Sequence, residues 1–172
     1  MLTGFPPIAS VDARILILGS MPSRESLSRQ QYYAHPRNAF WPLITAMLEA
    51  DDRLDYPARC SLLREHQIAL WDVLAGCERE GSLDSAIRDD SIEVNDFAGF
   101  FDRHQRIRRV FFNGARAQQE YRRRVLPTLP GPARELELLR LPSTSPAMAS
   151  LSREEKLRAW SEILNHGDSI PN

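Results

Sequence analysis

The chain has 172 residues, of which 42% are hydrophobic and 8% aromatic; that is enough for one domain with its own core and too apolar for a disordered chain. Its 22 basic and 23 acidic residues leave a net charge of −1, so overall charge does not indicate a nucleic-acid binder and any such function must come from local patches. No membrane span of about 20 apolar residues and no secretion signal is evident. We therefore expect one cytoplasmic domain, residues 1–172, with a core over about 12–166.

Four short apolar runs predict the strands of a sheet. They are continuously apolar rather than alternating, which is typical of parallel strands that are covered on both faces. The runs occupy residues 14–20, 68–74, 109–114 and 136–141.

Helical patterns lie between these runs and after the last one. The predicted helices cover residues 38–50, 57–67, 94–104, 115–126 and 152–165. Ser152 opens the last helix with a capping-box signature, and Gly167 is its expected stop, followed by a frayed tail. Alternating strands and helices predict a three-layer α/β/α domain around a central four-stranded parallel sheet.

The metal-binding residue types are few and scattered. Cys60 and Cys77 are the only cysteines, too few for an all-cysteine zinc site or an iron–sulfur cluster. They could form one disulfide, although two separate thiols fit an intracellular protein better. We expect no metal and no cofactor.

Ligands of an open parallel sheet bind beyond the carboxyl ends of its strands. The first strand leads into Ser20, Met21 and Pro22, a turn that is either purely structural or a place of close backbone approach to a ligand. Its spacing matches neither a phosphate-binding loop nor a dinucleotide-binding fingerprint.

The segment 32–41 contains more unusual residues than the turn after the first strand. Asn38 stands where a helix is expected to begin, so it is either an ordinary N-cap or a functional amide. Tyr33 precedes a His-Pro turn and could offer a stacking face to a planar base. Phe40 and Trp41 are expected in the core.

Two further loops follow strands. Asn113 begins an Asn-Gly turn after the third strand, where its amide could also read a base edge. After the fourth strand, Ser143, Thr144 and Ser145 stand between two prolines. This stiff polar loop is either a surface linker or a grip for a phosphate.

Taken together, these segments resemble the uracil-DNA glycosylase superfamily, and within it the hypoxanthine-DNA (deoxyinosine) glycosylase branch. The H-P-x-N-x-F-W stretch is also similar to mismatch-specific uracil glycosylases. The resemblance extends from about Ile15 to Trp160, and it is carried by residues 19–22, 33–41, 112–114 and 141–146.

The resemblance implies a monofunctional, metal-free enzyme of base excision repair. Such an enzyme flips a deaminated base (hypoxanthine, uracil or xanthine) out of double-stranded DNA and hydrolyses its N-glycosidic bond, leaving an abasic site. It implies Asn38 as the catalytic residue. Ser20, Met21, Pro22, Tyr33 and Asn113 then bind the base, and Ser143, Thr144 and Ser145 hold the flanking phosphates.

Three positions depart from the superfamily's pattern. Met21 stands where typical uracil glycosylases place a water-holding Asp or Asn, and Leu141 stands where they place a His. Met148 replaces an Asn that is usual in the hypoxanthine branch, and we consider it as a wedge that fills the hole left by the flipped base.

These departures keep other functions open: an inactive DNA-binding module of the same fold, or a mismatch-specific uracil or thymine glycosylase. An unrelated doubly wound enzyme acting on a small nucleotide or ester, or a partner-binding α/β protein, would be alternatives from other classes. We expect a monomer associated with the nucleoid.

Overall fold

The computed structural model describes residues 1–165 and contains the predicted parallel sheet. The strand order is β3-β2-β6-β7, and every neighbouring pair is parallel. The strands are β2 (Ile15–Gly19), β3 (Ile68–Asp72), β6 (Arg109–Asn113) and β7 (Glu137–Leu141). Because Gly19 pairs with Asp72 and Asn113 with Leu141, the carboxyl ends of all strands meet at one edge.

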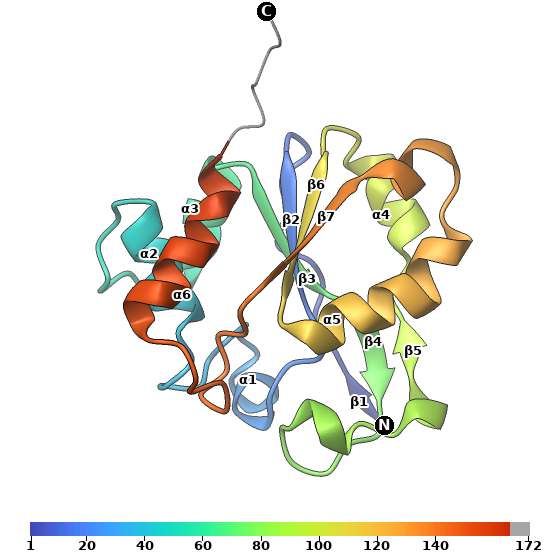
Figure 1. Ribbon diagram of the computed structural model, residues 1–172, viewed down its shortest axis with the longest axis horizontal. Coiled ribbons are helices and arrows are strands. Elements are labelled where there is room, and N and C mark those ends of the chain that lie inside the picture. Colours follow the sequence, from blue (N-terminus) through green and yellow to red (C-terminus); the bar gives the residue numbers. More distant parts are fainter. Residues whose placement is uncertain (166–172) are drawn as a thin grey trace, which may run out of the picture.

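Helices cover both faces of this sheet, which confirms the predicted three-layer architecture (Figure 1). One face carries α2 (Phe40–Met47), α3 (Tyr56–Glu65) and α6 (Arg153–Trp160), and the other carries α4 (Phe97–Arg103) and α5 (Ala115–Glu120).

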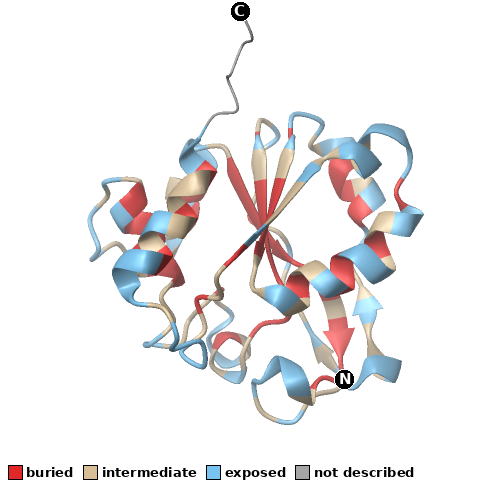
Figure 2. Ribbon diagram, viewed as in Figure 1, coloured by how far each residue is buried: buried red, intermediate tan, exposed pale blue. Residues whose placement is uncertain are grey.

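The central strands supply side chains to both layers, as their continuous apolarity predicts. On β2, Leu16 and Leu18 join the core beneath α4 and α5, whereas Ile17 joins the core beneath α2 and α6. Figure 2 shows these strands buried between the exposed outer surfaces of the helices. Burial on both faces holds the sheet between its two layers of helices and fixes the edge where its carboxyl ends lie.

Local capping explains where several helices begin. Asp55 caps α3 by accepting a hydrogen bond from the backbone N–H of Ala58 (2.9 Å). Ser152 caps α6 in the same way through Glu155 (3.1 Å), which confirms the predicted start of that helix. A short helix at the carboxyl edge, α1 (Arg24–Arg29), begins after the N-cap Ser23.

Some predicted helices are shorter in the structure. The predicted helix 94–104 begins only at Phe97, since Asp96 caps α4 through the N–H of Gly99. The predicted helix 115–126 ends as α5 at Glu120 and continues as one π turn, Tyr121–Val125. Single 3-10 turns follow or connect other elements, at Asp84–Ala86, Asp89–Ser91, Leu126–Thr128, Gly131–Glu135 and Ser161–Leu164.

The predicted strand 68–74 was wrong at its carboxyl end. The strand β3 stops at Asp72, and Leu74 begins a different strand, β4 (Leu74–Cys77). With β1 (Leu2–Thr3) and β5 (Glu93–Val94), β4 forms a small antiparallel sheet below the main one. The break places Asp72 at the carboxyl edge instead of inside a strand.

The packed part of the chain starts before residue 12, because Ile8 is buried and pairs with Leu70 of β3. Cys60 and Cys77 are both buried and unbridged. No helix within residues 1–165 is long and apolar enough to cross a membrane. The predicted helix stop at Gly167 and the tail beyond it lie outside the described residues.

Candidate active site

A cavity of about 300 Å³ opens at the carboxyl edge of the sheet, where ligands of parallel sheets bind. Its volume is at the small end of the range for ligand pockets, about 300–1,000 Å³. The structure brings every site residue predicted from the sequence to its walls: Ser20, Met21, Pro22, Tyr33, Asn38, Asn113, Ser143, Thr144, Ser145 and Met148.

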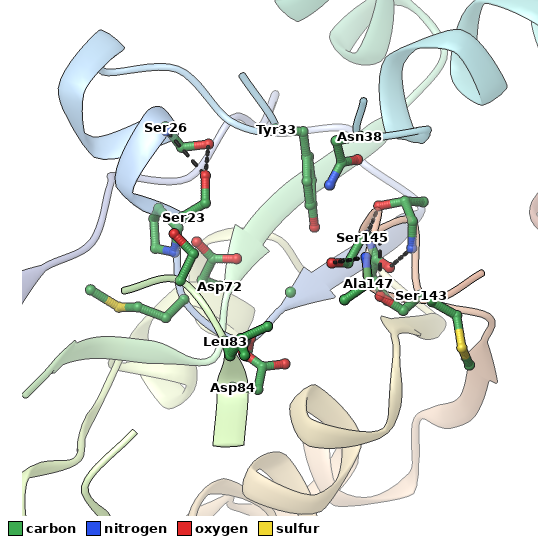
Figure 3. Close-up of a pocket in the computed structure, with 18 of the residues that line it drawn as sticks. Ser23, Ser26, Tyr33, Asn38, Asp72, Leu83, Asp84, Ser143, Ser145 and Ala147 are labelled. Carbon is green, nitrogen blue, oxygen red and sulfur yellow. Dashed lines mark hydrogen bonds between the residues drawn. The ribbon is translucent and has the colours of Figure 1, made fainter. Parts of the chain in front are cut away.

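Gly19 lies at the floor of this cavity between two polar side chains. A Cβ atom at this position would lie 2.5 Å from Oδ1 of Asp72 and 2.7 Å from the hydroxyl of Tyr33. Both distances are shorter than real Cβ contacts, so only glycine lets the carboxyl and the phenol approach the end of β2 together. Figure 3 shows the two side chains entering the cavity from different elements.

Asp72 is the functional candidate that the sequence analysis missed. Its side chain is only 3% exposed and its Oδ2 makes no hydrogen bond within the described chain. Burial raises the pKa of this carboxyl to about 7, the charge of Asp84 adds to the rise, and Arg79 opposes it. Asp72 is the one acidic residue in an otherwise apolar run, and this could have marked it as a candidate. The predicted strand 68–74 extends beyond residue 72 and so places Asp72 in the strand interior.

The amide of Asn38 is held in a fixed orientation beside the cavity. Its Oδ1 accepts a hydrogen bond of 2.9 Å from the backbone N–H of Phe40, the first residue of α2. The N-cap of α2 is Ala39, so Asn38 is not the N-cap that its position suggested; its side chain braces the turn before the helix and lines the cavity at the same time. One lone pair of Oδ1 and the NH2 group remain available for another contact.

One face of the Tyr33 ring packs against Phe40. Its ring stacks on Phe40 with centroids 4.1 Å apart and an interplanar angle of 27°. Its backbone φ of 53° is in the left-handed region, which is uncommon for a bulky residue and places the ring in the cavity wall. The hydroxyl is buried and makes no hydrogen bond to the described residues; this burial raises the pKa of the phenol.

The turn after β2 is pinned by the segment that follows β4. Ser20 donates a hydrogen bond of 2.7 Å to Asp84, and Arg79 donates one of 2.6 Å to the carbonyl of Pro22. The side chain of Met21 is buried in the core. This turn therefore lines the cavity, and it presents no side chain of Met21 that could hold a water.

Asn113 and Thr144 are hydrogen-bonded to each other. The Asn113 amide donates to the Thr144 hydroxyl and accepts from the Thr144 backbone N–H, each at 2.9 Å. Thr144 is only 1% exposed, and its carbonyl accepts from Ala39. The structure thus gives Thr144 a bridging role inside the protein rather than a place on the phosphate-facing surface.

The half-buried Ser143 and Ser145 face the cavity from the same loop. Their hydroxyls accept hydrogen bonds from the backbone N–H groups of Ser145 and Ala147 at 3.1 and 3.2 Å. These turns stiffen the loop and leave each hydroxyl hydrogen free to donate, which suits the oxygen of a phosphate.

Two exposed apolar side chains flank the cavity mouth. Met148 is 38% exposed and Leu83, which also lines the cavity, is 58% exposed. The loop that carries Met148 is anchored by α6, since the buried Lys156 ammonium donates a hydrogen bond of 2.7 Å to the Met148 carbonyl. The sequence analysis did not single out Leu83, because nothing in its neighbourhood marks it apart from an ordinary exposed leucine.

Among residues 1–165, no group of three His, Cys, Asp or Glu side chains is close enough together to hold a metal ion. The polar atoms that line the cavity are amides, hydroxyls, backbone groups and the two carboxyls of Asp72 and Asp84. This set is suited to hydrogen bonding with a small, planar, neutral ligand.

Comparisons with known proteins agree with this geometry. The family model of the uracil DNA glycosylase superfamily matches residues 6–165. A hypoxanthine DNA glycosylase of Methanosarcina acetivorans is 38% identical over 164 residues, which are 95% of this chain and 98% of the relative. A protein of the same name from Methanosarcina barkeri (strain Fusaro) is 38% identical over 66% of this chain and 72% of its own.

The fold has a counterpart among solved structures. A solution NMR structure from M. acetivorans, described as a candidate uracil DNA glycosylase, superposes with a TM-score of 0.77 at 35% identity. The match covers 95% of this chain and 98% of that one.

Proposed function

Because this chain belongs to the uracil-DNA glycosylase superfamily, we propose that it removes hypoxanthine from double-stranded DNA by hydrolysing the N-glycosidic bond. The curated relatives carry the name of that activity. The observation that carries the proposal is the Asn38 amide, fixed by Phe40 at the wall of a cavity of about 300 Å³.

The reaction does not require a strong base. As the bond breaks, positive charge develops on the sugar and negative charge on the departing base. Water adds late to such a sugar, so the site must orient the water and stabilise the base. In this proposal the remaining Oδ1 lone pair or the NH2 group of Asn38 holds the water or contacts the sugar, and the backbone N–H groups of Ser20, Met21 and Ser23 face the base.

The remaining roles follow from position. The ring of Tyr33 forms a wall against which the base stacks, with Phe40 behind it. Ser143 and Ser145 take the flanking phosphates, and Met148 fills the space that the extruded base leaves. Asn113 acts by holding the loop of Thr144, and direct reading of the base by Asn113 stays a prediction. We propose that the protein works as a single-domain monomer in the cytoplasm, at the nucleoid.

The test is a panel of duplexes, each with one inosine, uracil, xanthine or mismatched thymine, followed by alkaline cleavage of abasic sites. Inosine is expected to give the fastest cleavage. Binding without cleavage of any duplex would indicate an inactive DNA-binding module, which the side chains of Met21 and Leu141 would explain. Faster cleavage at uracil or thymine mismatches would indicate the mismatch-specific activity instead.

The role of Asn38 is tested by replacing it. Asn38→Ala should slow inosine excision by about 10²–10³, the usual cost of removing one well-aimed group, while duplex affinity stays within a few-fold. Asn38→Asp is the matched control, since its carboxylate can still accept from Phe40 and keep the start of α2 intact. Recovery of the rate in Asn38→Asp would assign the water to the oxygen, whereas a slow Asn38→Asp would assign the contact to the NH2 group. A normal rate in Asn38→Ala contradicts the assignment.

A further inference from the structure

Resting on the function proposed above, we infer that Asp72 in its neutral, protonated form donates a hydrogen bond to the carbonyl oxygen that deamination puts in place of an amino group. Through this bond Asp72 distinguishes the deaminated base from its undamaged parent.

The first support is the position of Asp72. It lines the cavity at the carboxyl end of β3, directly across from Gly19 of β2. Gly19 leaves open the space in which Asp72 Oδ1 and the Tyr33 hydroxyl converge. Asp72 therefore lines the cavity from the end of β3, where an inserted base can present its edge.

The second support is that Asp72 lacks a partner. Its Oδ2 is buried and makes no hydrogen bond within residues 1–165. An unpaired buried polar group is costly, and such groups in a cavity point to a ligand that supplies the missing partner. A carbonyl oxygen of an inserted base can accept from the neutral carboxyl of Asp72.

The third support is that no cation pairs directly with Asp72. Asp72 forms no salt bridge among the described residues. The groups that act on it are Asp84 from the 3-10 turn at Asp84–Ala86, Arg79 from the segment after β4, and the phenols of Tyr32 and Tyr33. Burial and the neighbouring Asp84 charge favour the neutral acid, with a pKa of about 7, and Arg79 offsets them only in part.

The chemical consequence is selectivity. Deamination converts the donor amino group of adenine into the acceptor oxygen of hypoxanthine, and it makes the same change from cytosine to uracil. A neutral carboxyl can donate to that oxygen, whereas an ionised carboxylate can only accept and would favour the amino group of the undamaged base. An ionised Asp72 would face the oxygen with a negative charge and would also oppose the negative charge that develops on the departing base.

The experiment measures single-turnover excision of inosine from a duplex, with enzyme in excess, between pH 5.5 and pH 8.5. The wild-type rate constant is expected to fall above pH 7, approaching tenfold for each pH unit. Asp72→Asn keeps a donor that does not titrate, so its rate should stay within about tenfold of wild type at pH 6 and lose the fall above pH 7. Titration of the base or of the duplex would affect both proteins equally.

Two further variants sharpen the result. Asp84→Asn removes the charge that raises the pKa of Asp72, so the fall should move to lower pH. Asp90→Asn is the control for a carboxyl-to-amide change, because Asp90 is exposed, bonded to Arg88 and outside the cavity; its profile should match wild type.

A wild-type rate that is flat or rises above pH 7 overturns the inference, and so does an Asp72→Asn variant that folds but retains the wild-type pH profile or is inactive at every pH. Folding is checked by thermal unfolding of each variant. These outcomes differ from a failure of the proposed function, in which the wild type excises no base at any pH.

Discussion

Asn113 and Thr144 hold each other by two hydrogen bonds of 2.9 Å, one in each direction, and so tie the end of β6 to the loop after β7. The same loop reaches across to α2, because the Thr144 carbonyl accepts from the N–H of Ala39 at 3.0 Å. Thr144, through its hydroxyl and its backbone groups, thus connects the strand edge, the serine loop and the residue that follows Asn38.

Asn113→Ala should weaken this connection. The change removes both bonds and leaves a buried backbone N–H unpaired, at a cost of about 1–3 kcal/mol in the free energy of unfolding. We expect inosine excision to slow as well, because the serine loop loses its anchor. Denaturant unfolding and single-turnover excision measure the two effects.

Thr144→Val provides the discriminating control for Asn113. If Asn113 acts through Thr144, the excision defects of the two single variants will not add in the double variant. Additive defects would contradict this and favour direct contact between Asn113 and the base.

Asp72→Asn should change how stability depends on pH. The folded pKa of about 7 is above the ordinary value of 3.8. Below pH 4 the carboxyl is protonated whether the chain is folded or unfolded, and its stabilising contribution is fully present. As pH rises, the unfolded chain ionises first, so stability falls until pH exceeds 7, by about 4 kcal/mol in total.

The variant lacks this titration, so relative to wild type it should become more stable as pH rises from 4 to 8. Chemical denaturation at both pH values measures the difference between the two proteins, with Asp90→Asn as the surface control. A difference that is the same at pH 4 and pH 8 would show that Asp72 is not buried as the neutral acid.

Leu83→Ala and Met148→Ala test the two rims of the cavity mouth. Both side chains are exposed, so the free energy of unfolding should change by less than about 0.5 kcal/mol. Excision from a duplex should slow by about tenfold or more for each, because an apolar wedge offsets the cost of unstacking a base.

The matched comparison is single-stranded DNA carrying the same inosine, where no base pair has to open and the rate should hardly change. Val11→Ala, an exposed apolar residue outside the cavity, serves as the protein control. Equal slowing on single and double strands would argue against a wedge.

Lys156→Met should loosen the loop that carries Met148. The buried ammonium donates to the Met148 carbonyl at 2.7 Å, and methionine fills a similar volume without the donor. We expect faster amide hydrogen exchange over residues 143–150 and a several-fold slower excision. Unchanged exchange in this segment would show that the loop does not depend on the lysine.

The sheet and its ligand edge could be predicted because they depend on local patterns. Runs such as Ile15–Gly19 are apolar without alternation, and that property alone indicates burial on both faces. Because the carboxyl ends of parallel strands meet, the residues after each run converge, and the structure places all ten predicted site residues around one cavity.

The roles of individual side chains depend on contacts between distant segments, which no local pattern shows. Asp72 looked like a strand interior because the end of β3 is set by its pairing with Gly19, 53 positions earlier in the chain. Thr144 looked like a surface hydroxyl because its partner Asn113 lies on another strand. Leu83 lines the cavity because bonds to distant residues hold its segment there, among them those from Ser20 to Asp84 and from Arg24 to Ser82.

Lys156 is the only lysine in the sequence. An amine that attacks the sugar of an abasic site forms a Schiff base and can lead to breakage of the strand. With its ammonium buried and bonded to a carbonyl, this chain has no lysine available for that attack. Borohydride should therefore trap no lysine-linked protein–DNA adduct, and the phosphodiester backbone should stay whole until a separate endonuclease cuts it.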